Sequence, residues 1–319
     1  MHIETIHFDN ASEAQELDQV LVPLLKNLEK TLSVQIVRRD LSVKISGEEE
    51  SVLRCSSFIE DLRTAREHTP LDAQVAAYAY EAFQRGEKDV FSRLASIRID
   101  VSARKPAIFP KTLGQRIYLD VMQNSAITFG MGPAGTGKTY LAMAMAVSSL
   151  MEEKVSRIIL TRPAIEAGEN LGYLPGDLHQ KISPYLRPLY DALHDMMPSE
   201  QIESHIERGT IEVAPLAYMR GRTLNHAFVI LDEAQNTTPQ QMLMFLTRLG
   251  FDSRCVITGD PTQIDLPDRQ RSGLLEARSI LSGISGLEFV ELSESDVVRH
   301  PLIQKVIEAY RKKGTSFSA

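Results

Sequence analysis

The sequence has few cysteines, no long apolar run and no leader-like N-terminus. Among 319 residues only Cys55 and Cys255 are cysteines, and no partner lies near either at metal-ligand spacing. This excludes a disulfide framework and is typical of small buried side chains in a reducing compartment. No stretch approaches the ~20 apolar residues of a membrane span, and the first residues lack a signal-length apolar run. We therefore expect a cytoplasmic protein without membrane contact.

The sequence also lacks an excess of positive charge and a metal-binding histidine pattern. The formal net charge is −7, so contact with nucleic acid must come from local basic patches and not from bulk charge. The eight histidines show no paired spacing, and no serine lies in a nucleophile elbow. Zinc chemistry and serine hydrolase chemistry therefore have no support. The length and a hydrophobic content of 43% predict two domains.

Residues 1–95 are predicted to form a small α+β domain with a KH-like order of elements. Residues 33–38 and 41–46 alternate apolar and polar side chains, which predicts a tight strand pair. A helix is expected over residues 48–67, and two helices broken near Pro23 are expected over residues 11–32. Residues 96–112 contain prolines and several basic residues, which is typical of a linker.

The expected break near Pro23 contains no glycine, whereas a KH domain clamps RNA with a GXXG loop. RNA binding and protein binding therefore remain equal alternatives for the first domain.

Residues 113–319 alternate strands and helices, which predicts an α/β fold with a doubly wound parallel sheet. Residues 164–208 are longer than an ordinary crossover and are rich in Pro, Gly and Tyr, so we expect this insertion to lie at the edge of a site or at an interface. Six apolar segments are the predicted strands: 126–129, 157–161, 210–214, 228–231, 254–258 and 287–292.

A GxxxxGK[ST] motif joins the first of these strands to an apolar helix. Backbone N–H groups of such a loop and the positive end of the helix form a cradle for phosphates. The lysine would reach the β- and γ-phosphates of ATP, and the final threonine would ligate Mg²⁺. The residues predicted to bind nucleotide are Gly132, Pro133, Ala134, Gly135, Thr136, Gly137, Lys138, Thr139 and Tyr140.

A second motif supplies carboxylates. Four apolar residues, 228–231, precede Asp232 and Glu233, the pattern of a buried strand that delivers acids at its carboxyl end. Asp232 is expected to hold Mg²⁺, and Glu233 to orient and polarise the attacking water. The next strand ends at Asp260 and Gln263, which are the predicted sensors of the γ-phosphate. With the glycine-rich motif, these acids predict that the doubly wound sheet is of the P-loop NTPase (RecA-like) type. The acid motif and the motif of Asp260 and Gln263 together resemble the nucleotide site of superfamily 1 helicases.

Further segments narrow the resemblance. They are Thr161–Pro163 with Glu166–Glu169, Leu171–Gly176, Asp232–Asn236, Gly259–Pro267 and Ser272–Leu274. With these motifs, residues 111–310 resemble the PhoH family of ATPases, specifically the branch with an N-terminal KH-like domain. The resemblance implies an RNA-associated, Mg-dependent ATPase that acts as a hexameric ring. It also implies a partner, an rRNA-processing endoribonuclease of the YbeY type.

Two further residues are assigned by analogy. Gln115 resembles the adenine-reading glutamine of superfamily 1 enzymes, because an amide can both donate to and accept from adenine; a surface glutamine is the alternative. Arg299 precedes a predicted helix and is the candidate arginine for charge on the transferring phosphoryl group. Arg162 is its competitor, and a surface ion pair is the alternative for both.

Only one nucleotide-binding lobe is predicted, so Arg299 is expected to act in trans on a neighbouring copy within a closed ring. Possible RNA contacts are Arg220 and Arg222, with Lys181, Arg187, Tyr173 and Tyr185 of the insertion. The leading hypothesis is ATP hydrolysis coupled to RNA binding or remodelling. A P-loop phosphotransferase acting on a small molecule and a nucleotide-switched scaffold for a protein partner are the alternatives.

Overall fold

The computed structural model describes residues 1–70, 72–163, 178–267 and 270–299, and residues 302, 303, 306, 309 and 310, without the side chains of residues 178–186. Two compact units are present: Met1–Arg98 with Phe109–Arg116, and Ile99–Ile108 with Ile117–Ala319. The segment predicted as a linker is divided between them. Residues 164–177 with Tyr173, and the side chains of Lys181 and Tyr185, lie outside the described residues.

The first unit is the predicted α+β domain, with a three-stranded antiparallel sheet of order β1-β3-β2. The predicted strand pair is confirmed as β2 and β3. Strand β1 was not predicted, and it pairs with β3 along its whole length. The unit consists of β1 (His2–His7), α1 (Ala11–Leu32), β2 (Gln35–Arg39), β3 (Ser42–Gly47), α2 (Glu49–Ala65), α3 (Ala73–Gln84) and α4 (Val90–Ala95).

The prediction of two helices broken near Pro23 is wrong, because α1 runs through the proline. Pro23 lies on the exposed side of the helix. Its missing N–H therefore removes one bond at the solvent face, while Leu17, Leu21, Leu24 and Leu28 bury a continuous apolar stripe. Burial of four leucines stabilises the helix by more than the proline costs, roughly 1.5–3 kcal/mol per fully buried side chain.

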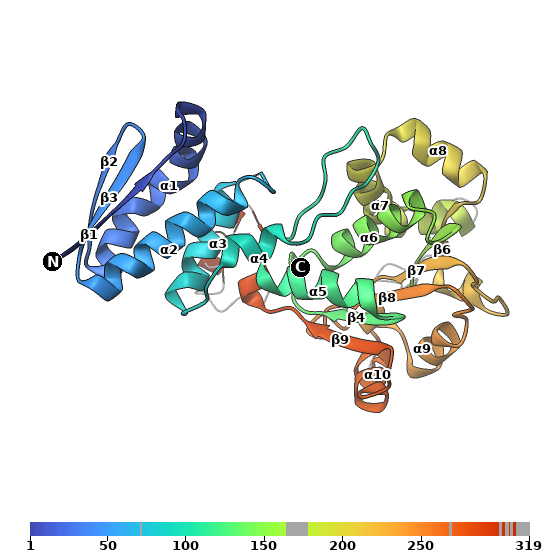
Figure 1. The fold of residues 1–319 in the computed structure, drawn as a ribbon. Helices are drawn as coiled ribbons and strands as arrows, with labels where there is room; N and C mark the ends of the chain where they lie inside the picture. The colour runs from blue at the N-terminus through green and yellow to red at the C-terminus, as the bar shows by residue number, and fades with distance from the viewer. Residues whose placement is uncertain are drawn as a thin grey trace. The chain divides into compact units, whose positions relative to one another are not determined.

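The second unit contains the predicted doubly wound sheet, and all six predicted strands are present. They form one parallel sheet of order β6-β5-β7-β8-β4-β9 (Figure 1). The strands are β4 (Ile127–Met131), β5 (Arg157–Arg162), β6 (Ile211–Pro215), β7 (Ala227–Leu231), β8 (Arg254–Gly259) and β9 (Leu287–Glu291).

Helices cover both faces of this sheet, α6, α7 and α8 on one side and α9 and α10 on the other (Figure 1). All five residues of β7 are buried, and Val229 and Leu231 share a core with Met242 and Phe245 of α9. The helices are α5 (Leu113–Asn124), α6 (Lys138–Met151), α7 (Leu178–Met196), α8 (Ser199–Glu207), α9 (Pro239–Leu246) and α10 (Gly273–Leu281), with short 3-10 turns η2 (Leu216–Met219), η3 (Ala234–Asn236) and η4 (Glu294–Asp296).

Strand order decides where the functional groups meet. β8 lies between β4, which leads into the glycine-rich loop, and β7, which leads into the two acids. Because all three strands are parallel, the loop, the acids and the polar tip of β8 emerge at the same edge of the sheet. In the part of the chain that the structure describes, no helix is long and apolar enough to cross a membrane.

Candidate active site

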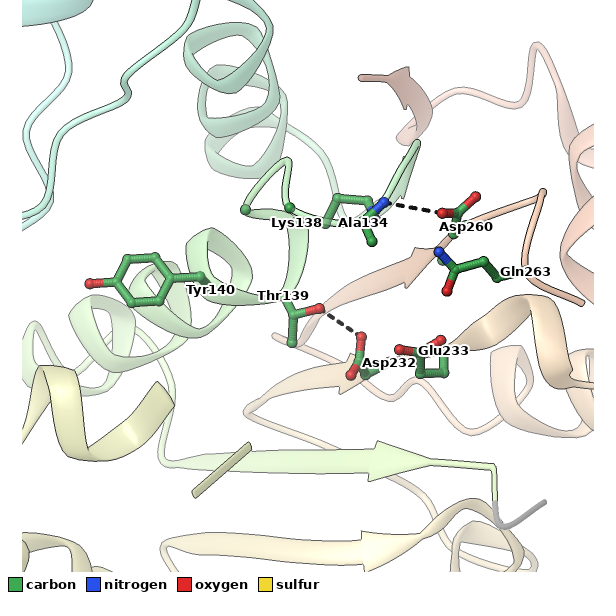
Figure 2. Close-up of a pocket in the computed structure, with 11 residues that line it drawn as sticks. Ala134, Lys138, Thr139, Tyr140, Asp232, Glu233, Asp260 and Gln263 are labelled. Carbon is green, nitrogen blue, oxygen red and sulfur yellow. Dashed lines mark hydrogen bonds between the residues drawn. The ribbon is translucent and has the colours of Figure 1, made fainter. Parts of the chain in front are cut away.

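A cavity of about 280 Å³ opens at the carboxyl edge of the sheet. It brings together the glycine-rich loop, the two acids and the tip of β8 (Figure 2). Its lining residues are Ala134, Gly135, Gly137, Lys138, Thr139, Tyr140, Asp232, Glu233, Gly259, Asp260 and Gln263. Three segments that are distant in sequence therefore meet in one site, as their motifs predicted.

The loop between β4 and α6 needs glycine at two positions because the chain after β9 approaches it closely. A Cβ at Gly132 would lie 2.3 Å from the carbonyl oxygen of Leu292, and a Cβ at Gly135 would lie 2.4 Å from Nε of Arg299. Gly135 also has φ +86, a left-handed conformation that side chains disfavour. Backbone and neighbours together thus require glycine at both positions.

Lys138 is the first residue of α6 and is buried. Its Nζ donates to the carbonyl oxygens of Gly132 and Pro133 at 2.7 and 2.8 Å. Burial lowers the pKa of Lys138; the charges of Asp260, Asp232 and Glu233 oppose that shift, and Arg299 reinforces it. The loop therefore holds the ammonium group at its centre, beside the N-terminus of a helix, where anions bind favourably.

Asp232 follows β7 and accepts two hydroxyl hydrogen bonds on the same oxygen. Thr139 Oγ1 and Thr258 Oγ1 each donate to Asp232 Oδ1 at 2.7 Å. The hydroxyl of Thr139 and the carboxylate of Asp232 are oxygen ligands of the type that Mg²⁺ prefers, and Mg²⁺ commonly binds through one or two protein oxygens and substrate phosphates. The donor set of this pair fits a magnesium ion.

Glu233 is held at both carboxylate oxygens. Oε1 lies 2.9 Å from Nη2 of Arg162, and Oε2 accepts from Nε2 of Gln235 at 2.6 Å. The residue has φ +54, which is uncommon for a side chain larger than glycine and is typical of functional positions. Arg162, the competitor for the phosphate-facing arginine, is thus the ion-pair partner of Glu233.

The tip of β8 contacts the glycine-rich loop through Asp260. Asp260 Oδ2 accepts from the backbone N–H of Ala134 at 3.1 Å (Figure 2), while Oδ1 accepts from the N–H and the hydroxyl of Thr262. Gln263 lines the cavity from the same turn. Asp260 therefore fixes the position of the loop, and both predicted sensor residues lie at the site.

Arg299 lies against the glycine-rich loop of its own chain. Its Nη2 donates to the carbonyl oxygen of Ala134 at 2.6 Å, and the N–H of Val298 donates to the carbonyl oxygen of Gly135 at 2.9 Å. The sequence led us to expect this guanidinium on the nucleotide of a neighbouring copy. Within one chain the guanidinium contacts its own loop, because residues after β9 fold back over that loop; its action on a neighbouring copy stays a prediction.

Two other predicted nucleotide-binding residues, Tyr140 and Gln115, do not point toward the acids or do not line the cavity. Tyr140 lines the cavity, but its ring points away from Asp232 and Glu233 (Figure 2), and burial raises the pKa of its hydroxyl, with a smaller effect from Asp195. Gln115 belongs to the first unit. It is buried and accepts from the N–H of Lys111 at 2.8 Å, so the alternative of a surface glutamine is wrong, and its role toward adenine stays a prediction.

Sequence reasoning missed the contacts of three residues with the two acids. Thr258 donates to Asp232, and Gln235 and Arg162 both bind Glu233. Thr258 meets Asp232 because β7 and β8 pair with Leu231 opposite Ile257. That register is not visible in a sequence without the strand order. The signal for Thr258 in the sequence was its position as a polar residue near the end of a buried apolar strand, the edge at which ligands bind in such sheets.

The chain is similar to PhoH-like proteins over most of its length. The PhoH-like protein family profile matches residues 107–311. The PhoH-like protein of Bacillus subtilis (strain 168) is 49% identical over 305 residues, which cover 95% of this chain and 96% of the relative. That of Mycobacterium tuberculosis (strain H37Rv) is 50% identical over 289 residues, 90% of this chain and 82% of the relative.

Protein PhoH of Escherichia coli (strain K12) is 42% identical over 205 residues, which cover 64% of this chain and 58% of the relative. Among solved structures, the Sulfolobus solfataricus SWI2/SNF2 ATPase core in complex with dsDNA aligns at 12% identity with a TM-score of 0.35. The alignment covers 64% of this chain and 53% of that one, a likeness too weak to support a conclusion about this chain.

Proposed function

Because the chain belongs to the PhoH family and its cavity has the groups of a nucleotide hydrolase, we propose that it hydrolyses ATP and couples hydrolysis to RNA binding or remodelling. One observation carries the proposal: Thr139 Oγ1 donates to Asp232 Oδ1 in the cavity that Lys138 and Glu233 also line. Phosphate binding, metal binding and water activation are thereby combined in one site.

The first task of the site is to bind a triphosphate. Lys138 and the N-terminus of α6 supply positive charge and N–H groups to the phosphates. The ammonium of Lys138 donates to Gly132 O, Pro133 O and Thr136 Oγ1, so contact with a phosphate would exchange at least one of these bonds for a charge-assisted bond. Bound Mg²⁺, held by Thr139 and Asp232, would neutralise charge on the phosphate oxygens.

The second task is to activate water. Glu233 has its carboxylate at the cavity, where it can accept a hydrogen bond from water and orient it toward the terminal phosphate. Arg162 and Gln235 hold the carboxylate, so that its direction is fixed before the substrate arrives. At the tip of β8, Asp260 accepts a hydrogen bond from the glycine-rich loop, and Gln263 lines the cavity. Both residues are therefore placed to respond when the γ-phosphate is lost.

RNA coupling and assembly are the less direct parts of the proposal. RNA coupling is supported by the resemblance of Asp232–Gln235 and Thr258–Gln263 to superfamily 1 helicase motifs. Arg220 is exposed, whereas Arg222 is engaged by Glu212 through two bonds of 2.6 and 2.7 Å; we therefore favour Arg220 as an RNA contact. We also propose a homo-oligomeric ring, with a hexamer as the expected size, and an endoribonuclease of the YbeY type as partner.

The decisive experiment measures steady-state ATPase rates of Lys138→Ala and Glu233→Gln beside wild type. Each variant should lose about 10²-fold or more in kcat, since a positioned proton acceptor or charge contributes roughly that much. Lys154→Ala and Glu152→Gln are matched controls, because these side chains form an exposed ion pair in the same unit. Wild-type turnover in both site variants would reject the proposal.

The same assay with single-stranded RNA, beside a light-scattering mass, tests the coupling. We expect RNA to raise the ATPase rate of a hexamer-sized particle. Transfer of phosphate to a small acceptor without RNA stimulation would instead identify a phosphotransferase. Tight nucleotide binding with negligible turnover would identify a nucleotide-switched scaffold.

A further inference from the structure

Gln235 is enclosed next to the catalytic carboxylate. It lies in η3, and its side chain is fully buried. Its backbone carbonyl accepts from the hydroxyl of Ser272 at 2.7 Å, and a Cβ at Gly259 would lie only 2.9 Å from its Oε1. The carboxamide therefore has neither solvent nor free space around it, and its orientation is set by its hydrogen bonds.

Both polar atoms of the Gln235 carboxamide form hydrogen bonds, one with the acid pair after β7 and one with the turn after β8. Nε2 donates to Glu233 Oε2 at 2.6 Å, and Oε1 accepts from the backbone N–H of Asp260 at 3.1 Å. Rotating the amide by half a turn would place its oxygen against a carboxylate and its NH₂ against an N–H, so both bonds would be lost. Only one orientation satisfies this buried group.

These bonds continue to the phosphate-binding loop. Asp260 accepts from the N–H of Ala134 through Oδ2 and donates its own N–H to Gln235, and Gln235 donates to Glu233. The opposite oxygen of Glu233 is held by Arg162. A short series of bonds thus connects the loop with the carboxylate, through the tip of the strand that separates β4 from β7.

We propose that Gln235 is a positioning residue that fixes the Glu233 carboxylate relative to the phosphate-binding loop, so that water is aligned only when loop and β8 tip are correctly placed. The inference rests on the proposed function, because it assigns Gln235 a role through Glu233. Buried amides of this kind are strong constraints, since a buried polar group that loses its hydrogen-bond partner is destabilising.

Gln235→Glu separates positioning from a merely structural role. Glutamate keeps an acceptor for the Asp260 N–H but replaces the donor facing Glu233 with a carboxyl oxygen. Two carboxyl groups at this distance share one proton, so the ionised fraction of Glu233, the form that accepts a proton from water, falls. We expect kcat to fall by about 10–10²-fold, the loss typical of a misplaced catalytic group. KM and the dissociation constant for a fluorescent ATP analogue should stay within about twofold of wild type, because no phosphate contact of Lys138 is removed.

Gln241→Glu is the matched control. Gln241 Oε1 accepts from the N–H of Thr238 at 2.9 Å in the capping box of α9, so the variant makes the same chemical change and keeps the same type of backbone bond, at an exposed position outside the cavity. We expect its kcat to equal that of wild type. Thermal unfolding of both variants identifies any loss of folded protein.

The double variant Glu233→Gln/Gln235→Glu completes the test. If Gln235 acts through Glu233, adding Gln235→Glu to Glu233→Gln causes no further loss of kcat. An additive loss, or an equal loss in Gln241→Glu, would overturn the positioning role. Wild-type turnover in Gln235→Glu beside an inactive Glu233→Gln would reject this inference alone, whereas wild-type turnover in Glu233→Gln would reject it together with the proposed function.

Discussion

At the scale of single residues, the hydroxyls around Asp232 orient the carboxylate that we propose as a magnesium ligand. Thr139 and Thr258 both donate to Oδ1, and both side chains come from elements that meet only in the folded sheet. Thr139 is a predicted magnesium ligand, whereas Thr258 orients the acid. Residues that orient a ligand in this way typically change metal affinity by about 10–100-fold when they are removed.

Thr258→Val removes that hydroxyl with little change in shape. We expect the Mg²⁺ concentration for half-maximal ATPase activity to rise by about tenfold, because Asp232 loses one of its two orienting donors. Magnesium titrations of ATPase rate and of nucleotide binding provide the measurement. An unchanged magnesium requirement would contradict the orienting role of Thr258.

Thr161→Val is the control, on a neighbouring strand of the same sheet. Thr161 is fully buried, and its Oγ1 has no hydrogen-bond partner among the described residues. Replacing an unsatisfied buried hydroxyl with a methyl group should leave the magnesium requirement unchanged and raise the free energy of unfolding by about 1 kcal/mol. Denaturant unfolding of both variants measures that difference.

At the scale of elements, the strands of the second unit and the parallel, doubly wound type of their sheet were predictable. The order of the strands within the sheet was not. Segments such as 228–231 are continuous apolar runs that end in acids, a pattern that few structures other than a buried parallel strand satisfy. The order that places β8 between β4 and β7 depends on contacts distant in sequence, so the roles of Thr258 and Gln235 could not be inferred. In the first unit the proline rule failed because Pro23 faces solvent, and β1 was missed because most of its side chains are not buried.

The segment after β9 is hydrogen-bonded to the glycine-rich loop through Arg299 and Val298. Gly135→Ala should disturb the loop twice, through backbone strain at φ +86 and through collision with Arg299. Gly283→Ala isolates the first effect, because Gly283 has φ +87 in the same unit and a Cβ added there would meet no described atom within 4 Å. Each should lose about 1 kcal/mol of stability from strain, measured by denaturant unfolding.

Only Gly135→Ala should also weaken nucleotide binding, by about tenfold, which corresponds to roughly 1.4 kcal/mol. A fluorescence titration with an ATP analogue measures this effect. Equal affinities in the two variants would show that the contact of Arg299 with the loop is irrelevant to the nucleotide.

At the scale of the whole molecule, the position of Arg299 predicts how copies of the chain cooperate. Its guanidinium lies on the loop of its own chain, and acting from that position it would serve the nucleotide of its own copy. Mixing Arg299→Ala with Lys138→Ala should therefore restore no ATPase activity, whatever the size of the assembly. Recovery on mixing, with both variants retaining the oligomeric mass of wild type, would instead demonstrate action in trans.

The placement of β8 has a mechanical consequence. Within the described sheet, no backbone hydrogen bond joins the strand that carries the phosphate-binding loop to the strand that carries the acids, because β8 pairs with both. Within the sheet, the distance between the glycine-rich loop and the two acids is therefore governed by β8, which ends with Thr258 and Gly259 and is followed by Asp260. A change in the width of this strand end would shift the loop relative to the acids.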